Sequence, residues 1–218
     1  MTMNYTNVIS QCLFVSTKTW HFLKALWFVM IMKPILSPFI QVRGYWVISG
    51  HRGRDYQDNS ACLHAYVSDH TEQEIIWITK SPTNYQSLKN QGDRVLKKNS
   101  IAARLAILQA SRLIYSHGED DLDSHLIYWL KLPGIKVYLN HCLNLTKTGQ
   151  MAQKSVAQMS TKQVHAFQKK ITRFDYLLAS SEIERDYFMR SFLAQETQYL
   201  LGGGAHLDPF FKLRGKAP

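Results

Sequence analysis

The sequence predicts an α/β fold in which a Rossmann-like parallel sheet is flanked by helices and preceded by an apolar, basic helix. From Tyr45 onward, short β-rich runs alternate with helical patterns. Such alternation with apolar strands is typical of a parallel sheet that is covered on both faces. The chain has 218 residues, 45% hydrophobic and 19% charged, which is the composition of a folded protein. Its length favours one large domain, or one domain with an appendage.

Each expected element is placed by its residue pattern. The expected strands are Tyr45–Ser49, Ile75–Thr79, Leu113–Ser116, Lys136–Leu139, Tyr176–Ala179 and Gln198–Leu201. The expected helices are Asn59–Asp69, Ser100–Ala110, Ser124–Lys131, Lys162–Ile171 and Glu182–Phe192. Ser100 is a suitable N-cap, because a serine hydroxyl can accept a hydrogen bond from the first helical turn. Sheets of this kind bind ligands beyond the carboxyl ends of their strands, so the segments that follow the strands are the candidate sites.

The formal net charge of +10 suits nucleic acid, anionic lipid or a phosphorylated polymer. Six basic residues and no acid precede Asp55, namely Lys18, Lys24, Lys33, Arg43, Arg52 and Arg54. The rest of the chain mixes both signs and lacks a dense Lys/Arg stripe that would follow a phosphate backbone. The pattern therefore argues against nucleic acid as the partner.

The three cysteines, Cys12, Cys62 and Cys142, are widely separated and match no zinc or redox spacing. An odd, sparse set is typical of a reducing compartment. The sequence thus predicts free thiols and a cytoplasmic protein.

Residues 1–44 form a segment of different character. From Trp20 to Met32 the chain is almost wholly apolar, interrupted by His21 and Lys24. This run is shorter than the ~20 residues that a membrane-spanning helix needs, and Pro34 and Pro38 are expected to end any longer helix. Three interpretations stay open: a helix in the membrane interface with tryptophans and lysines at headgroup level, a buried core helix, and a true membrane span.

The loop after the first strand, GHRGRDYQDNS, spans Gly50 to Ser60. Asp58 or Asn59 can cap the helix that follows it. The loop is either a plain strand-to-helix turn with a cap, or a polar site that faces the crevice.

The loop Asn140–Gly149 follows the fourth expected strand. A histidine at the carboxyl end of a strand, His141, is well placed to remove a proton from a substrate hydroxyl. Lys147 could attract phosphate, and a purely structural histidine is the alternative. A thiol-nucleophile role for Cys142 is disfavoured, because neighbours along a strand point to opposite faces.

Two further segments carry polar or flexible residues. His117–His125 holds two histidines and four acids, which could bind a divalent metal. An acidic first turn with Asp123 as the cap is the favoured alternative, so we predict neither a metal nor a cofactor. Gly202–Gly204 is expected to be a hinge, because no helical pattern follows it and Pro209 comes soon after.

Taken in order, these segments resemble the CDP-glycerol glycerophosphotransferase family of teichoic-acid and capsule polymerases. The family's Gly…Tyr-x-Asp-Asn-Ser motif has its counterpart at Tyr56, Asp58, Asn59 and Ser60. The segment IIWITKS is similar to the next family strand. The segment LNHCLNLTKTG aligns with the family's Trp-His-Gly…Lys-Lys…Gly segment, and His141, Lys147 and Gly149 occupy matching positions. The segment FDYLLASSEIERDYF resembles the family's Phe-Asp-Tyr strand and the Ser-Ser turn that follows it. The segment GGAHLD lies where the family has Gly-x-Pro-Arg-x-Asp.

The resemblance implies the N-terminal half of a GT-B fold, which has two Rossmann-like domains. It also implies transfer of glycerol phosphate from CDP-glycerol to a polymer or lipid-linked hydroxyl, with release of CMP. His141 would be the general base, and Tyr56, Asp58, Asn59, Ser60 and Lys147 would bind substrate. The expected location is the inner face of the cytoplasmic membrane.

The chain also departs from the family pattern. Asn140 replaces Trp, Cys142 replaces Gly, Thr146 replaces Lys, and Ala205–His206 replaces Pro-Arg. We expect residues 1–44 to associate with the membrane, 45–208 to form the acceptor-side domain, and 209–218 to begin a linker to a missing donor domain. Such a half would bind CDP-glycerol only with that domain and would be inactive alone. A nucleotide-sugar glycosyltransferase of capsule synthesis and a non-catalytic membrane-associated binding module are the alternatives.

Overall fold

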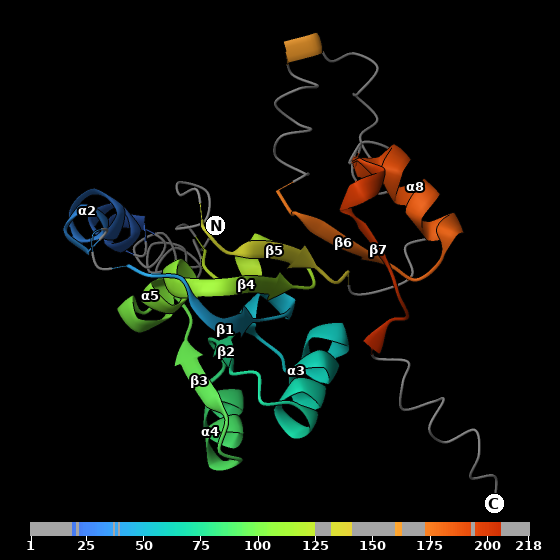
Figure 1. Cartoon of the computed structure of the whole chain (residues 1–218). Helices are drawn as coiled ribbons and strands as arrows, with labels where there is room; N and C mark the ends of the chain where they lie inside the picture. Colours follow the sequence, from blue (N-terminus) through green and yellow to red (C-terminus); the bar gives the residue numbers. More distant parts are fainter. Residues whose placement is uncertain are drawn as a thin grey trace, which may run out of the picture.

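The computed structural model describes residues 19–20, 22–36, 38, 40–124, 132–140, 160–162, 173–192 and 195–205. Within these residues the chain forms a seven-stranded sheet whose neighbouring strands are all parallel (Figure 1). The strand order is β3-β2-β1-β4-β5-β6-β7. The strands are β1 Arg43–Ile48, β2 Ile75–Thr79, β3 Arg94–Lys97, β4 Ala110–Tyr115, β5 Ile135–Tyr138, β6 Tyr176–Ala179 and β7 Tyr199–Leu201. The predicted Rossmann-like α/β fold is confirmed.

The main helices of the described residues are α3 Asp58–His70, α4 Pro82–Asn90, α5 Ile101–Gln109 and α8 Glu182–Phe192. Short 3₁₀ turns are η3 His51–Gly53, η4 Glu119–Asp121 and η7 Glu196–Gln198. The sequence predicts α3, α5 and α8, and the hydroxyl of Ser100 accepts a hydrogen bond from the Ala103 N–H at 3.1 Å, as expected of the N-cap of α5. The expected helices Ser124–Lys131 and Lys162–Ile171 fall almost wholly outside the described residues.

The sequence analysis misses β3 and α4. β3 has four residues at the edge of the sheet and begins and ends with a charged side chain, so it carries little apolar pattern. α4 is mostly polar, and only Leu88 of its nine residues is buried. Its start is nevertheless well defined, because Ser81 caps it through a 3.3 Å bond from the Asn84 N–H and Pro82 begins its first turn.

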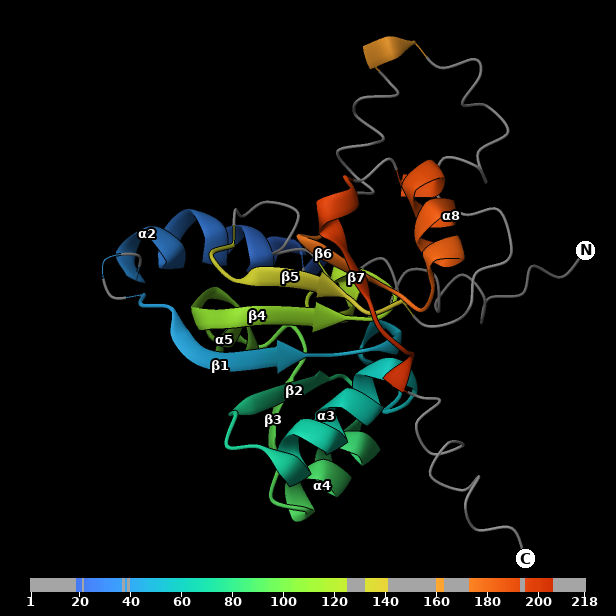
Figure 2. The same ribbon diagram turned by 45° about the vertical axis from the view of Figure 1, so that its right-hand side comes forward.

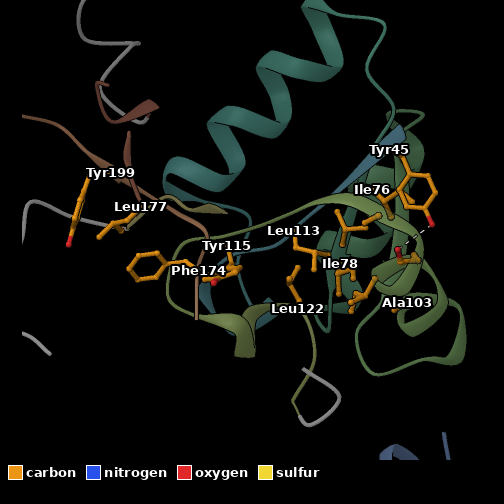
Figure 3. Packing of buried hydrophobic residues seen from close by; sticks show 14 of the residues in the cluster. Tyr45, Ile76, Ile78, Ala103, Leu113, Tyr115, Leu122, Phe174, Leu177 and Tyr199 are labelled. Atoms are coloured by element: carbon orange, nitrogen blue, oxygen red, sulfur yellow. Dashed lines mark hydrogen bonds between the residues drawn. The ribbon is translucent and has the colours of Figure 1, made fainter. Parts of the chain in front are cut away.

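The buried side chains form two clusters, one on each face of the sheet. On one face, Ile76 and Leu113 pack with residues of α5 such as Ala103 (Figure 3). The same cluster includes Phe188 of α8. On the other face, Ile48 and Trp77 pack with α3 and α4, which lie together on that side (Figure 2). Consecutive strand residues point to opposite faces, so a central strand contributes side chains to both clusters, and β2 is buried at every position.

The N-terminal apolar segment packs one of its sides on the domain. Residues 22–27 are helical, η1 (Phe28–Met32) is a π-helical turn, and α2 spans Lys33–Leu36. The side chain of Phe28 is fully buried and packs with Leu108 of α5, which contributes about 1.5–3 kcal/mol. This side of the segment agrees with the core-helix interpretation.

The helical conformation continues past Pro34, where the sequence predicts an end. Proline lacks an N–H and clashes with the carbonyl group four residues before it. The π-helical turn Phe28–Met32 lies directly before this region, and such a turn widens the hydrogen-bond spacing. The helix therefore accommodates Pro34 instead of ending at it.

The opposite side of the segment is exposed and apolar. Its exposed large side chains are Trp20, Phe22, Leu23, Trp27, Met30, Ile31 and Ile35. The ammonium group of Lys24 lies 4.9 Å from the centroid of the Trp20 ring. Among the described residues, no helix has both the length and the apolar character needed to cross a membrane.

Candidate functional site

The chain changes its direction across the sheet between β1 and β4. From β1 it continues to β2 and β3 at one edge, and from β4 it continues to β5, β6 and β7 toward the other. β1 and β4 are neighbours in the sheet. The loop after β1 leads toward one edge, and the loop after β4 leads toward the opposite edge. Sheets of this kind bind ligands in the crevice at such a point, so the candidate site is built by residues 49–60, residues 116–124 and the segment that follows β5.

A buried carboxylate joins the first two of these loops. The oxygens of Asp121 accept hydrogen bonds from the backbone N–H groups of Arg52 (2.6 Å), Ser116 (3.0 Å) and His117 (2.9 Å). Asp121 is fully buried, and N–H donors of this kind stabilise a carboxylate charge in such a position. The side chain therefore fixes the backbone of both loops.

Lys98, which directly follows β3, packs under the loop after β1. Its ammonium group donates to the carbonyl oxygens of Arg52 (3.1 Å) and Asp120. Gly53 has a φ of +74°, and a Cβ there would lie 2.9 Å from Cδ of Lys98, so this position requires glycine. Burial lowers the pKa of Lys98, although Asp120 and Asp121 oppose the shift. The sequence analysis misses Lys98 because it misses β3.

Backbone strain is concentrated at the carboxyl edge of the sheet. Within the described residues, the non-glycine residues with positive φ are His51 (46°), Arg52 (55°), Asp58 (62°), Asn99 (63°) and Asn140 (56°). All of them lie in the segments that follow β1, β3 and β5. Asn and Asp adopt this conformation more readily than other residues. His51 and Arg52 are therefore the more informative pair, because residues held in such conformations cluster at functional sites.

Two histidine rings lie side by side where the loops after β1 and β4 meet. The ring centroids of His51 and His117 are 5.0 Å apart, and the N–H of His51 donates to Nδ1 of His117 at 3.2 Å. Nδ1 of His51 pairs with the carboxylate of Asp55. The side chains of His51 and Asp55 are 38% and 50% exposed, so solvent reaches this pair. The sequence analysis assigns no role to His51, although its spacing of four residues from Asp55 was a usable signal.

Tyr56, a predicted substrate-binding residue, is half-buried between the loop and the sheet. Its hydroxyl lies 3.0 Å from Nδ1 of His64 and donates to the carbonyl oxygen of Ala61 at 3.3 Å. Its ring packs edge-on against Trp77, with centroids 4.7 Å apart. Burial raises the pKa of Tyr56 to about 12 and lowers the pKa of His64. These contacts fix the loop on α3 and β2, and the substrate-binding role of Tyr56 stays a prediction.

Asp58, Asn59 and Ser60 form the first turn of α3. The N-cap position is Gln57, whose side chain makes no capping hydrogen bond, so the expectation that Asp58 or Asn59 caps this helix is wrong. Ser60 is fully buried, and its hydroxyl has no partner among the described residues. It packs against Gly50, where an added Cβ would lie 3.2 Å from Cβ of Ser60.

The side chain of Asn59 bonds to the segment that follows β5. Its amide donates to the carbonyl oxygen of Asn140 at 2.9 Å, and both residues are buried. This bond joins the start of α3 to the segment after β5, directly before His141. His141 and Lys147 lie outside the described residues, so of the predicted site residues the structure brings together Tyr56, Asp58, Asn59 and Ser60.

The acidic segment after β4 makes structural ion pairs. Glu119 lies 3.4 Å from both Lys136 and Arg173, Asp120 lies 3.8 Å from Arg52, and Asp123, the expected helix cap, forms a buried 3.0 Å pair with Arg104. Burial raises the pKa of Glu119 against the opposing effect of its two cations. The described residues contain no group of three side chains that could hold a metal ion.

A parallel sheet with polar loops converging at its switch point defines a Rossmann-like α/β domain. The particular family follows from the sequence: residues 43–217 match the family model described as CDP-Glycerol:Poly(glycerophosphate) glycerophosphotransferase. Because this match covers most of the chain, the chain belongs to that family. The resemblance inferred from the motifs is confirmed. A comparison with curated protein sequences gave no significant match.

Several solved structures have the same fold. A histidine-to-asparagine variant of the wall teichoic acid polymerase TagF, soaked with CDPG for 30 minutes, aligns with a TM-score of 0.63 at 15% identity, covering 92% of this chain and 52% of that one. TagF itself aligns with a TM-score of 0.58 at 16% identity, over 90% of this chain and 50% of that one. A histidine-to-alanine variant gives 0.57 at 15%, over 90% and 49%. The chain thus spans about half the length of these structures.

Proposed function

We propose that the chain is the acceptor side of a glycerophosphotransferase, which moves glycerol phosphate from CDP-glycerol to a hydroxyl of a cell-surface polymer or lipid-linked acceptor. The family match over residues 43–217 is the observation that carries this proposal. The polar loops at the carboxyl edge support it, because ligands of such sheets bind there. We assign acceptor binding to Tyr56, Asp58, Asn59, Ser60 and Lys147.

The transfer needs one base. The acceptor oxygen forms a bond to the phosphorus of the glycerol phosphate group, the bond from that phosphorus to CMP breaks, and the hydroxyl proton passes to the base. We assign this role to His141, in the segment after β5. The bond from Asn59 to the carbonyl oxygen of Asn140 would position the backbone directly before it. Lys147 would stabilise the negative charge on the transferred group.

Donor binding, in our proposal, requires a second Rossmann-like domain. The chain spans about half the length of the solved TagF structures that it matches. The residues proposed here serve the acceptor, and we assign none of them to the cytidine nucleotide. We therefore expect the 218-residue chain to bind acceptor but to be inactive on CDP-glycerol by itself.

We also propose that the N-terminal segment holds the protein on the inner face of the cytoplasmic membrane. Trp20, Trp27 and Met30 are exposed on the side that does not pack on the domain, and Lys24 lies against the Trp20 ring. Aromatic and aliphatic side chains with flanking lysines are typical of helices that lie in the interface of an anionic membrane. Such a location would bring the crevice close to a lipid-linked acceptor.

The test is a comparison of donors with the native protein isolated from its host. CDP-glycerol, CDP-ribitol and a set of sugar nucleotides are each incubated with an oligo(glycerol phosphate) acceptor, and CMP or UDP release and acceptor extension are measured. We expect extension from CDP-glycerol. Extension from a sugar nucleotide alone would instead favour a capsule glycosyltransferase. The absence of transfer from every donor would favour a non-catalytic binding module, and unchanged extension by the His141→Ala protein would contradict the role of His141 as the base.

A further inference from the structure

His51 and Asp55 form a pair at the carboxyl edge of the sheet that the proposed reaction does not yet use. Nδ1 of His51 contacts the carboxylate of Asp55. A carboxylate only accepts hydrogen bonds, so in a neutral ring the proton belongs on Nδ1 and the lone pair on Nε2. The Gln57 amide is 3.0 Å from the same Nδ1, and its oxygen and nitrogen can exchange places to suit this tautomer.

The second nitrogen of the His51 ring is open to a ligand. Nε2 has no hydrogen-bond partner among the described residues, and 38% of the side chain is exposed. An Nε2 atom fixed in this way by an Asp on Nδ1 is a good acceptor for a hydroxyl hydrogen. A neutral imidazole accepts a hydrogen bond without bringing a positive charge, so the ring in this form suits a polyol better than a phosphate.

The surroundings hold the ring in one place. His51 keeps a φ of 46°, and its N–H is bonded to Nδ1 of His117. Because that N–H can only donate, Nδ1 of His117 is the accepting nitrogen there. Arg52, the next residue, is fixed by Asp121. A histidine on a strained backbone that two other loop residues hold in position is preorganised, which is what recognition of a small hydroxyl group requires.

The loop that carries His51 also reaches the segment of the proposed base. Its C-terminal end leads into α3, where Asn59 bonds the carbonyl oxygen of Asn140, the residue before His141. The His51 pair and the start of the His141 segment therefore belong to the same edge of the sheet. A terminal glycerol unit has two neighbouring hydroxyl groups, and only one of them reacts.

We infer that His51, positioned by Asp55, binds the non-reacting hydroxyl of the acceptor's terminal glycerol unit and so selects a polyol end. This inference rests on the proposed function, because it concerns the same acceptor. His51 is the ligand-contacting residue, and Asp55 is a positioning residue that fixes the ring tautomer. The pair needs no change in the roles assigned to His141 and Lys147.

The test measures binding to the 218-residue chain by calorimetry with two probes. One is a short oligo(glycerol phosphate) with free terminal hydroxyls, and the other is the same oligomer with those hydroxyls methylated. His51→Asn is the main variant, because asparagine also tolerates positive φ. We expect this variant to bind the free-end oligomer about tenfold more weakly, and the methylated oligomer with unchanged affinity. His70→Asn, at the exposed far end of α3, is the matched control and should change neither.

Asp55 is tested by measuring the tautomer of the His51 ring, which a general effect on stability would not change. The ¹⁵N shifts of the His51 ring should report a proton on Nδ1 in the wild type and a mixture of tautomers in Asp55→Asn, which should also lose affinity for the free-end oligomer. Equal affinity of the wild type for both oligomers, or an equal loss for both in His51→Asn, would overturn the inference while leaving acceptor binding intact. No binding of either oligomer would contradict both the inference and the proposed acceptor role, whereas the donor assay tests the reaction separately.

Discussion

The ion pair between Arg104 and Asp123 lies in the interior beside the candidate site. The two atoms Nε and Oδ2 are 3.0 Å apart, and the side chains are 2% and 0% exposed. Removing one partner leaves an uncompensated buried charge, which typically costs about 3–5 kcal/mol. We predict that Asp123→Asn lowers the free energy of unfolding in urea by an amount in that range.

The exposed pair Arg94–Glu74 provides the control for this prediction. Its side chains are 53% and 51% exposed, and exposed pairs contribute ~0–1 kcal/mol. Glu74→Gln should therefore leave the urea midpoint almost unchanged. Equal effects of Asp123→Asn and Glu74→Gln would show that burial of the Arg104–Asp123 pair is not what makes it important.

His64 makes the stability of the fold depend on pH. Burial of the ring lowers the pKa of His64 below its ordinary value of 6.5, against the opposing charges of Asp93 and Asp69. The unfolded chain therefore takes up this proton at a higher pH than the folded protein does. The stability linked to His64 is present above about pH 6.5 and is lost as the pH falls toward the lower folded pKa.

Urea unfolding between about pH 8 and pH 5 measures this effect. The wild type should lose stability over the range, and His64→Gln, which keeps a polar partner for Tyr56, should lose less. His70→Gln removes an exposed histidine from the same helix and should retain the wild-type slope. If the stability of the His64→Gln protein fell with pH as steeply as that of the wild type, the His64 ring would not be the source of the pH dependence.

Residue patterns were enough to locate part of the candidate site but not its connections. Tyr56 and Asn59 stand out because they belong to a recognisable motif. The partner of Asn59 is the carbonyl oxygen of Asn140, 81 residues away, and no local pattern encodes such a contact. Asp121 was missed for the same reason, since it acts on the backbone of a loop that is distant in sequence. Lys98 was missed because the strand before it, β3, was not predicted.

Among the elements, β2 is the clearest success, because its run of apolar residues marks a buried strand. β2 and α8 have the predicted bounds, Ile75–Thr79 and Glu182–Phe192. β3 and α4 were missed because they pack at the edge of the sheet, where few of their side chains are buried. The order of the strands follows from pairing between segments far apart in the chain, so it could be inferred only from the general behaviour of parallel sheets.

The N-terminal segment has one side that packs on the domain and one side that is exposed, and the two can be separated by mutation. Trp27→Ser with Ile35→Ser changes exposed side chains, 44% and 61% accessible. We predict that this double variant lowers partition onto vesicles containing anionic lipid by at least tenfold, because aromatic and aliphatic side chains provide the interfacial binding energy. Its free energy of unfolding should stay within about 1 kcal/mol of the wild type.

Phe28→Ala is the complementary variant. Its side chain is fully buried against α5, with the Arg104 guanidinium 5.8 Å from the ring centroid. Truncation of a buried phenylalanine typically costs about 3–5 kcal/mol, so this variant should be less stable. Vesicle binding that depends on Phe28 and not on Trp27 and Ile35 would contradict the proposed membrane-facing side.

At the scale of the whole molecule, the sequence predicts the fold class and the family because many weak signals agree. Strand–helix alternation indicates a parallel sheet, and the ordered motifs between about Tyr45 and Asp208 indicate the family. The acceptor, the polymer and the donor could not be predicted in the same way. They depend on the shape and charge of a crevice that is assembled from several loops, and single substitutions such as Asn140 for Trp alter it without altering the fold.

The need for a donor domain bears on the size of the working enzyme. The chain has a mass of 25.2 kDa and covers 52% of a TagF structure of the same fold. If donor binding requires a second Rossmann-like domain, the native protein that carries out transfer should have a mass roughly twice as large, because such a domain adds well over ~100 residues.

Intact-mass measurement of the host protein, detected through a peptide of this chain, tests this expected mass. A mass near 25.2 kDa together with CMP release would contradict the need for a second domain in the same chain, and would direct the search for the donor site to a separate subunit or to the chain itself.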